Sequence, residues 1–261
     1  MTQSIFKNTQ YFILDMDGTF YLGDRLIEGA PSFIEKLLES GRDYLFFTNN
    51  SSNDVETCLN KLCKMGFKAS EDKIIISSHI TIDYIQKNYD GASVYLLGNE
   101  KLTAHFKSAG INLTQDKPDI VVLGFDTSLN YKKMWDAVRF LEGGATYIAT
   151  HPDVNCPTPD GYMPDVGSMI ALFETSTGRR PLIMGKPATA TVDYLTSYLA
   201  CSRKDLAFVG DRLSTDILIG QDHGIPNALV LSGVTGKAEL EASDIKPDIT
   251  VDRLADLAPY L

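Results

Sequence analysis

Two aspartates that stand one residue apart follow a short apolar run near the N-terminus. The run Tyr11–Leu14 leads directly into the sequence DMDGT, in which Asp15 and Asp17 are the two acids. At a strand end, residues i and i+2 point the same way, so two carboxylates there repel each other and one tends to keep its proton. A hard cation such as Mg²⁺ relieves that repulsion and is the usual occupant of sites with phosphates. Taken alone, the motif also fits a turn with a helix-capping Asp.

Two further segments end predicted strands with residues suited to phosphate. Thr48, Asn49 and Asn50 lie at the end of YLFFTNNSS, and they supply a hydroxyl and backbone N–H groups for phosphoryl oxygens. Lys186 lies in PLIMGKP, after a strand and before a helix, where it would be a point charge for phosphate. A loop lysine is more often simply solvated.

A fourth segment, LAFVGDRLSTDI, ends another strand with Asp211 and carries Asp216 in the first turn of a helix. Either residue alone fits a plain structural role, with one Asp as an N-cap and the other on the surface. Four strand ends, each with a residue competent for phosphate or metal, are hard to assign to chance.

The elements that must position these residues alternate along the chain. Helices are predicted over Pro31–Ser40, Asn53–Met65 and Ala188–Ala200, each with apolar residues at helical spacing or with start and stop signals. Most of the predicted strands are β-branched or aromatic without strict alternation, as in parallel strands covered on both faces. The chain is therefore predicted to be an α/β protein. The strands are Tyr11–Leu14, Tyr44–Thr48, Ile74–Ser77, Val94–Leu97, Ile120–Leu123, Tyr147–Thr150, Leu182–Met184, Leu206–Val209 and Ala228–Leu231.

The composition narrows the class of protein. A chain of 261 residues with 44% hydrophobic and 22% charged residues can bury a sizeable core. Its net charge of −10 disfavours nucleic acid and anionic membranes as partners. The four cysteines show no CxxC spacing, and neither a signal peptide nor a membrane span is legible, so a cytoplasmic location is expected.

The four motifs, in this order, resemble those of the haloacid dehalogenase superfamily: DMDGT, FTNNS, GKP and GDRLSTDI. The segments LNYKKM and GATYIATHPD…CPTPDGYMPDVGSM resemble the NagD-like, or p-nitrophenyl phosphatase-like, branch, which carries a large α/β cap of the C2 type. The resemblance implies a Rossmann-like, doubly wound parallel core formed by residues 1–79 and 181–261, with a cap domain inserted over residues 80–180. One departure is His151, where the branch often has Asn.

The resemblance also implies a mechanism. Asp15 would attack phosphorus and form an aspartyl-phosphate, and Asp17 would serve as general acid and base. Mg²⁺ would be held by Asp15, the backbone carbonyl of Asp17 and Asp211, with Asp216 as a further ligand or an orienting residue. Dehalogenation is not expected, because dehalogenases lack the second Asp.

Phosphoryl oxygens would be held by Thr48, Asn49, Asn50 and Lys186. In the cap, His151 and Asp153 are the candidates for substrate contact, although a structural turn capped by Asp153 fits equally well. The expected substrate is a small phosphorylated metabolite, such as a sugar phosphate or a nucleotide. A phosphotransferase or phosphomutase, or a phosphoester-binding sensor without catalysis, is the alternative. A homodimer rests on analogy alone.

Overall fold

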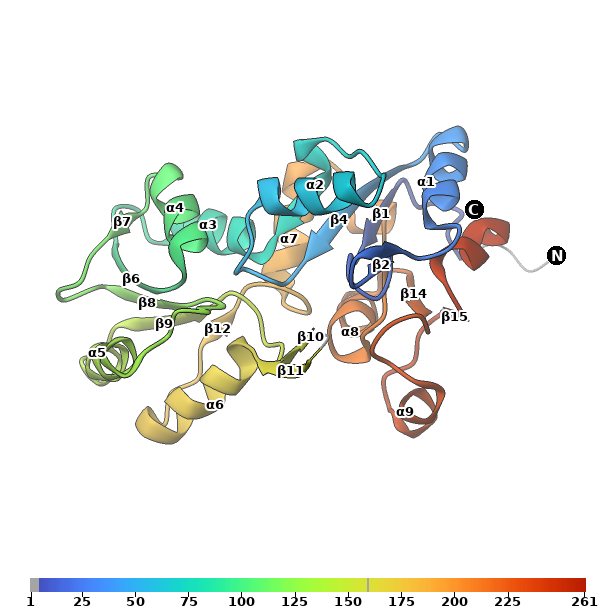
Figure 1. The fold of residues 1–261 in the computed structure, drawn as a ribbon. Helices are drawn as coiled ribbons and strands as arrows, with labels where there is room; N and C mark the ends of the chain where they lie inside the picture. The colour runs from blue at the N-terminus through green and yellow to red at the C-terminus, as the bar shows by residue number, and fades with distance from the viewer. Residues whose placement is uncertain (1–4, 159) are drawn as a thin grey trace. The chain divides into compact units, whose positions relative to one another are not determined.

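The computed structural model describes residues 5–158 and 160–261, and the chain divides into two compact units. Unit 1 comprises Met1–Thr48, Val55–Ile75 and Leu195–Leu261, and unit 2 comprises Asn49–Asp54 and Ile76–Tyr194. Each unit is built around its own parallel sheet (Figure 1).

A six-stranded sheet forms the centre of unit 1, in the order β15-β14-β13-β1-β4-β5. Its inner strands are almost wholly buried, which explains why they read as continuous apolar runs rather than as alternating ones. The strands are β1 Tyr11–Leu14, β4 Asp43–Thr48, β5 Ile74–Ile76, β13 Leu206–Gly210, β14 Asn227–Val230 and β15 Ile249–Val251.

The register of this sheet aligns the ends of its central strands. Leu14 of β1 pairs with Val209 of β13 on one side and with Phe46 of β4 on the other. All three strands are parallel, so the residues that follow them leave the sheet at one edge. The residues after β1 and β13 and the end of β4 therefore belong to the same rim of unit 1.

Helices cover both faces of the unit 1 sheet (Figure 1). The helix α1 packs against β4, and α8 packs against β13. A short hairpin of β2 and β3 follows β1 directly. These elements are α1 Ala30–Glu39, α2 Val55–Lys64, α8 Leu218–His223, α9 Lys237–Ala242, β2 Tyr21–Leu22 and β3 Arg25–Leu26, while α7 Thr189–Tyr198 runs from unit 2 into unit 1.

Unit 2 has a five-stranded parallel sheet in the order β12-β9-β8-β6-β7, with α3 and α4 on one side and α5 and α6 on the other (Figure 1). Alternate strand residues such as Tyr95, Val121 and Tyr147 form one core with the inner faces of α5 and α6. The elements are β6 Ser93–Leu97, β7 Asn112–Leu113, β8 Ile120–Leu123, β9 Thr146–Ala149, β12 Leu182–Ile183, α3 Ser77–Asn88, α4 Glu100–Ser108, α5 Tyr131–Glu142 and α6 Val166–Thr177.

The predicted α/β fold with parallel sheets is confirmed, and every predicted strand is present within one or two residues. One strand lies elsewhere than expected: β12, which precedes Lys186, pairs with β9 in the unit 2 sheet. The predicted core, residues 1–79 and 181–261, includes residues 49–54, 76–79 and 181–194, which contacts within the chain group with unit 2. No helix in the described residues is long and apolar enough to cross a lipid bilayer.

Part of the Pro/Gly-rich segment after β9 forms an antiparallel hairpin. The strands β10 Asn155–Thr158 and β11 Gly161–Pro164 pair over their full length. Nearly all of their residues are exposed, so the apolar pattern that identifies buried strands is missing here.

Two partly buried histidines of unit 2, His79 and His105, lie close together. His79 in the first turn of α3 accepts a hydrogen bond from the backbone N–H of Ile76 at 3.0 Å, and its ring lies 4.6 Å from that of His105. Burial, followed by the nearby His105, lowers the pKa of His79 from 6.5 to about 4. The unfolded chain therefore binds a proton between pH 6.5 and about 4 that the folded protein excludes.

We expect the contribution of His79 to folding to be complete above pH 6.5 and to be lost as the pH falls through this window. At pH 5 the loss relative to neutral pH should be about 1–2 kcal/mol. The variant His79→Gln keeps an acceptor for the Ile76 N–H but cannot titrate, so its loss between pH 7 and pH 5 should be smaller by that amount. Urea unfolding of both proteins at the two pH values measures the difference, and identical losses would contradict the assignment.

Candidate active site

Five of the predicted site residues belong to unit 1 and lie at or just beyond the rim where β1, β4 and β13 end: Asp15, Asp17, Thr48, Asp211 and Asp216. The backbone N–H of Asp15 still donates to the carbonyl of Val209 at 2.9 Å, so the ladder continues to the first acid. The sequence motifs at these strand ends are thus brought to one edge of the sheet, as expected.

The carboxylate of Asp211 is enclosed by backbone. Asp211 is 1% exposed, and its Oδ2 accepts a hydrogen bond from the N–H of Val234 at 2.7 Å. A Cβ atom at Gly18 or at Gly233 would overlap this carboxylate. The hydroxyl of Ser232 donates to the carbonyl of Gly18 at 2.7 Å, which joins the two glycine-containing loops around Asp211.

Asp216 is also buried, at 2% exposure, so the alternative that it is a surface residue does not hold. It lies in a π-helical turn, Leu213–Ile217, that leads into α8. Its Oδ2 accepts a hydrogen bond from the N–H of Arg212 at 3.2 Å, and Gly210 leaves it room, because a Cβ there would overlap the carboxylate. A widened turn of this kind is frequent at functional sites.

Asp17 differs from the other acids because its side chain is 56% exposed. Partial desolvation raises the pKa of Asp17, and the charge of Lys61, with smaller help from Arg212, opposes the rise. The Lys61 ammonium lies 3.6 Å from Asp17 Oδ2 and 4.1 Å from the centroid of the Tyr21 ring. Tyr21 is tied to the same loop, since its carbonyl accepts from the N–H of Gly18 at 2.7 Å.

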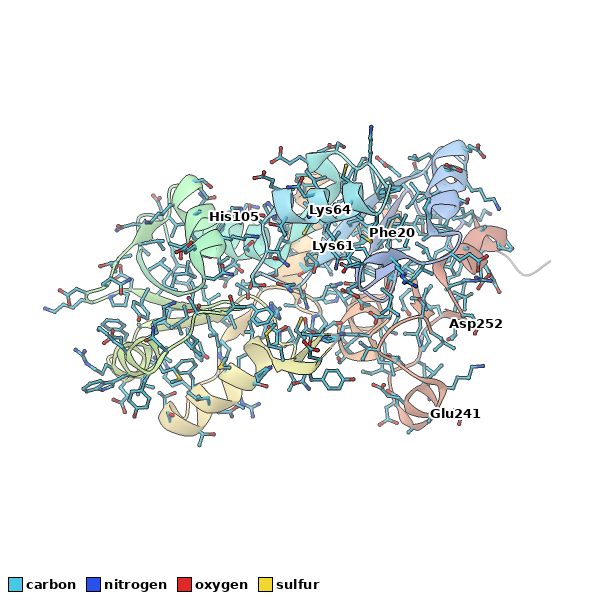
Figure 2. All side chains as sticks on the ribbon, viewed as in Figure 1. Phe20, Lys61, Lys64, His105, Glu241 and Asp252 are labelled. Carbon is cyan, nitrogen blue, oxygen red and sulfur yellow. The ribbon has the colours of Figure 1, made fainter. Side chains whose placement is uncertain are left out.

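Lys61 was not predicted as a site residue. It projects from α2 (Figure 2), and it stands thirteen positions after Thr48 in a helix with one other lysine, Lys64, so nothing in the motifs singles it out. Only the fold places it beside Asp17.

The described residues contain no group of three or more His, Cys, Asp or Glu side chains arranged to hold a metal ion. The predicted set, however, counts on one backbone carbonyl at Asp17, and magnesium usually takes one or two carboxylates together with waters and phosphate oxygens. The buried carboxylates of Asp211 and Asp216 and the backbone at Asp17 are hard oxygen donors of that kind.

The remaining predicted residues belong to unit 2. Here the Asn49 side chain binds the backbone of Lys186 on both sides: Oδ1 accepts from the Lys186 N–H at 2.9 Å, and Nδ2 donates to the Lys186 carbonyl at 3.0 Å. Both residues are buried, at 6% and 2% exposure. The Asn49 amide therefore uses one of its two N–H groups and one lone pair of its oxygen on the backbone of Lys186.

The residues that follow Asn49 are also held by side-chain hydrogen bonds. Asn50 Oδ1 accepts from the N–H and from the hydroxyl of Ser52, at 2.9 and 2.7 Å, which forms a local turn. Ser51 Oγ accepts from the N–H of Phe125 at 2.9 Å and lies 3.0 Å from the hydroxyl of Thr150. These bonds explain why residues 49–54 group with unit 2.

His151 and Asp153, the predicted substrate contacts, lie at the base of the β10–β11 hairpin. His151 has no exposed surface, and its ring nitrogens lie 3.3 Å from Asp153 Oδ2 and 3.5 Å from Asp165 Oδ1. Asp165 caps α6, and its N–H donates to the carbonyl of Val154 at 3.0 Å, which closes the hairpin base. Within the described residues neither ring nitrogen of His151 makes a hydrogen bond, and contact with substrate stays a prediction.

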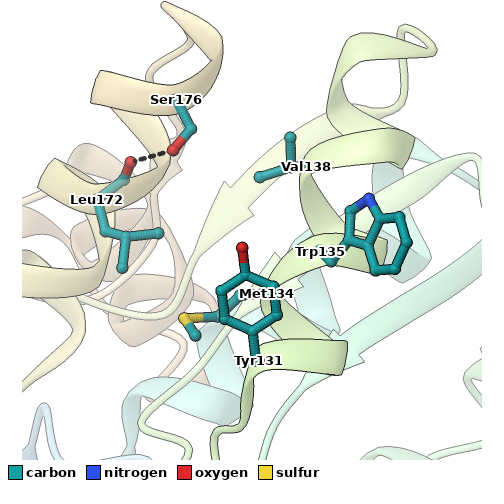
Figure 3. A pocket seen from close by; sticks show the side chains of 6 residues that line it. All are labelled: Tyr131, Met134, Trp135, Val138, Leu172 and Ser176. Atoms are coloured by element: carbon teal, nitrogen blue, oxygen red, sulfur yellow. Dashed lines mark hydrogen bonds between the residues drawn. The ribbon is translucent and has the colours of Figure 1, made fainter.

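A groove of about 500 Å³ between α5 and α6 is of another kind (Figure 3). Its described lining carries no charged side chain, and its polar side-chain groups are the hydroxyls of Tyr131 and Ser176 and the indole N–H of Trp135. The Ser176 hydroxyl is already bonded to the carbonyl of Leu172 at 3.0 Å. The groove is therefore unsuited to phosphate.

Comparisons with known proteins agree with this arrangement. Residues 12–112 match the family described as haloacid dehalogenase-like hydrolase, and residues 183–257 match a second family of the same type. An acid sugar phosphatase of Staphylococcus saprophyticus is 34% identical over 98% of this chain and 99% of its own length. A 5′-nucleotidase of Bacillus subtilis is 32% identical over 98% of this chain and 100% of its own.

Solved structures give the same result. A 4-nitrophenylphosphatase from Thermotoga maritima matches with a TM-score of 0.94 and 41% identity over 98% of both chains. NagD from Escherichia coli matches with a TM-score of 0.88 and 27% identity over 95% of this chain and 98% of its own. A glycerol phosphate phosphatase from Mycobacterium tuberculosis, in complex with magnesium, matches with a TM-score of 0.88 and 28% identity over 98% of this chain and 79% of its own.

The enclosure of Asp211 generates a prediction about Gly18. The variant Gly18→Ala should lose about 2 kcal/mol or more of folding stability, because the new Cβ meets a buried carboxylate and the backbone has a φ of +87°. Gly23→Ala is the matched control: its φ is +58°, but a Cβ there has nothing within 4 Å. Urea unfolding measures both, and equal losses would show that backbone strain alone decides the effect.

Proposed function

Since the chain belongs to the haloacid dehalogenase-like hydrolases, in the branch of NagD and the p-nitrophenyl phosphatases, we propose that it hydrolyses small phosphate monoesters with the help of a divalent cation. The observation that carries this proposal is the shared rim of β1 and β13, where Asp15 follows one strand and the backbone-enclosed Asp211 follows its neighbour.

The chemistry falls to the two acids of the first motif. Asp15 attacks phosphorus through a carboxylate oxygen, a P–O bond to Asp15 forms, and the bond to the leaving oxygen breaks. Asp17 gives its proton to that oxygen and then takes one from the water that hydrolyses the aspartyl-phosphate. The exposure of Asp17 supports this role, because a proton donor must reach both the leaving group and the water.

The cation would be held by Asp15, the backbone carbonyl of Asp17 and Asp211, with Asp216 as a further ligand or as the residue that orients the set. Magnesium is the favoured ion, since a relative of this chain has been solved in complex with magnesium and the donors are hard oxygens. When bound, it offsets negative charge on the phosphoryl oxygens and on Asp15.

The phosphoryl oxygens would be held by Thr48, Asn49, Asn50 and Lys186, with hydroxyl, backbone N–H and ammonium donors. Unit 2 would supply the side chains that recognise the leaving group of the substrate. The β10–β11 hairpin, whose residues are nearly all exposed and which follows His151 and Asp153, is the segment of unit 2 proposed for this contact. Relatives of this chain are named for sugar phosphates, nucleotides and glycerol phosphate, so the proposal is made for phosphate monoesters as a class.

The first test concerns the nucleophile. Asp15→Asn keeps the shape of the side chain but removes the attacking carboxylate, and phosphate release from p-nitrophenyl phosphate with Mg²⁺ should fall by at least about 10³-fold. Asp24→Asn is the control, because Asp24 is an exposed acid of the β2–β3 turn. Turnover of Asp15→Asn within tenfold of the unmodified protein would falsify the assignment.

A second test concerns Lys61, whose charge steadies the Asp17 carboxylate. Lys61→Met should lower kcat/KM about tenfold for an alkyl phosphate, whose leaving group needs protonation, and only about twofold for p-nitrophenyl phosphate. Lys61→Arg should retain activity on both. Lys64→Met, on the same helix and exposed, is the control. An equal loss on both substrates would mean that Lys61 does not act through Asp17.

A further inference from the structure

The contact between Asn49 and Lys186 joins two sequence motifs that are 137 residues apart. The Asn49 amide faces a donor on one side and an acceptor on the other, so its oxygen must lie toward the Lys186 N–H and its nitrogen toward the Lys186 carbonyl. The pair resembles one rung of a β-ladder, with a side chain in place of one strand. It fixes the peptide of Lys186 at both ends.

The surroundings hold Asn49 itself in place. The Ser77 hydroxyl donates to the Asn49 carbonyl at 2.5 Å, and the N–H of Gly185 donates to the carbonyl of Thr150 at 2.8 Å. A Cβ on Gly185 would lie 2.6 Å from both Asn49 Oδ1 and the Thr150 carbonyl, so only glycine permits this approach. Three turns, at residues 49, 150 and 185, are thus locked together in unit 2.

We propose that Asn49 is a positioning residue that acts on the reaction through Lys186, and that its side chain is not itself a phosphate ligand. The inference rests on the proposed function, because the position of the Lys186 backbone affects the reaction only if the Lys186 ammonium binds a phosphoryl group. A lysine side chain has four rotatable bonds, so its reach is defined only when its backbone is fixed. A displacement of about 1 Å can cost about 100-fold in rate. Loss of the two hydrogen bonds between Asn49 and the Lys186 backbone should therefore lower the rate.

A double-mutant cycle separates the two roles. Asn49→Leu removes both hydrogen bonds and should lower kcat/KM on p-nitrophenyl phosphate, and the affinity for inorganic phosphate with Mg²⁺, by about 30-fold to 100-fold. In the Lys186→Ala background the same change should cost less than about threefold, because the group that Asn49 positions is already gone. Affinity for inorganic phosphate, measured by calorimetry, keeps the cycle readable where turnover is slow.

The matched control is Asn99→Leu. Asn99 also lies in unit 2 and also bonds two backbone groups, accepting from Leu102 N–H at 3.0 Å and donating to the Ser52 carbonyl at 2.8 Å. It should lose stability, as Asn49→Leu does, while keeping phosphate affinity. Asn49→Asp, which keeps the acceptor for the Lys186 N–H but loses the donor, should be intermediate and serves if the leucine variant does not fold.

Two results would overturn the proposal: equal losses for Asn49→Leu with and without Lys186, which would make Asn49 an independent ligand or a purely structural residue, or no loss at all. The proposed function fails separately, when Asp15→Asn retains phosphatase activity. In that case the phosphate affinities of the cycle still report whether Asn49 and Lys186 are coupled.

Discussion

The approach of two backbone loops to one buried carboxylate is the constraint on which unit 1 depends at its rim. Asp211 is surrounded closely enough that neither Gly18 nor Gly233 can carry a side chain. A polar group with 1% exposure is costly to bury unless it is hydrogen-bonded, and the N–H of Val234 donates to one oxygen of Asp211. The glycine of the first motif is therefore explained by the aspartate of the fourth. Two residues that are far apart in the sequence, Gly18 and Asp211, therefore depend on each other for space.

In unit 2, hydrogen bonds from neutral side chains hold the turn after β4 in place, where unit 1 uses a carboxylate. The turn after β4 is held by Asn49, Asn50 and Ser51, each of which accepts from backbone N–H groups, and Lys186 is anchored to the first of them. The motif residues thus do two kinds of work. Under the proposed function, some would meet a phosphoryl group, whereas others, such as Asn49, fix the peptides from which those groups extend.

Much of this could be predicted from the sequence. Parallel strands covered on both faces leave continuous apolar runs, and the acids at their ends follow from the motifs, so Asp15, Asp17 and Asp211 were found at the rim. The assignment of β12 to the second sheet was not legible, because a two-residue strand carries no pattern that distinguishes one sheet from another. Lys61 was missed for a similar reason: its importance comes from a contact across the fold, not from its neighbours in the chain.

The aspartates of the unit 1 rim differ in their exposure and in their hydrogen-bond partners. Asp211 and Asp216 are buried and bonded to backbone N–H groups, which holds their oxygens in place before any ligand arrives. Asp17 is 56% exposed, and the Lys61 ammonium lies 3.6 Å from its Oδ2. A preorganised oxygen lowers the cost of binding charge, whereas a proton carrier must be reachable. Under the proposed mechanism, the buried Asp211 and Asp216 would hold the cation and the exposed Asp17 would carry the proton, so burial rather than residue type would divide these two tasks.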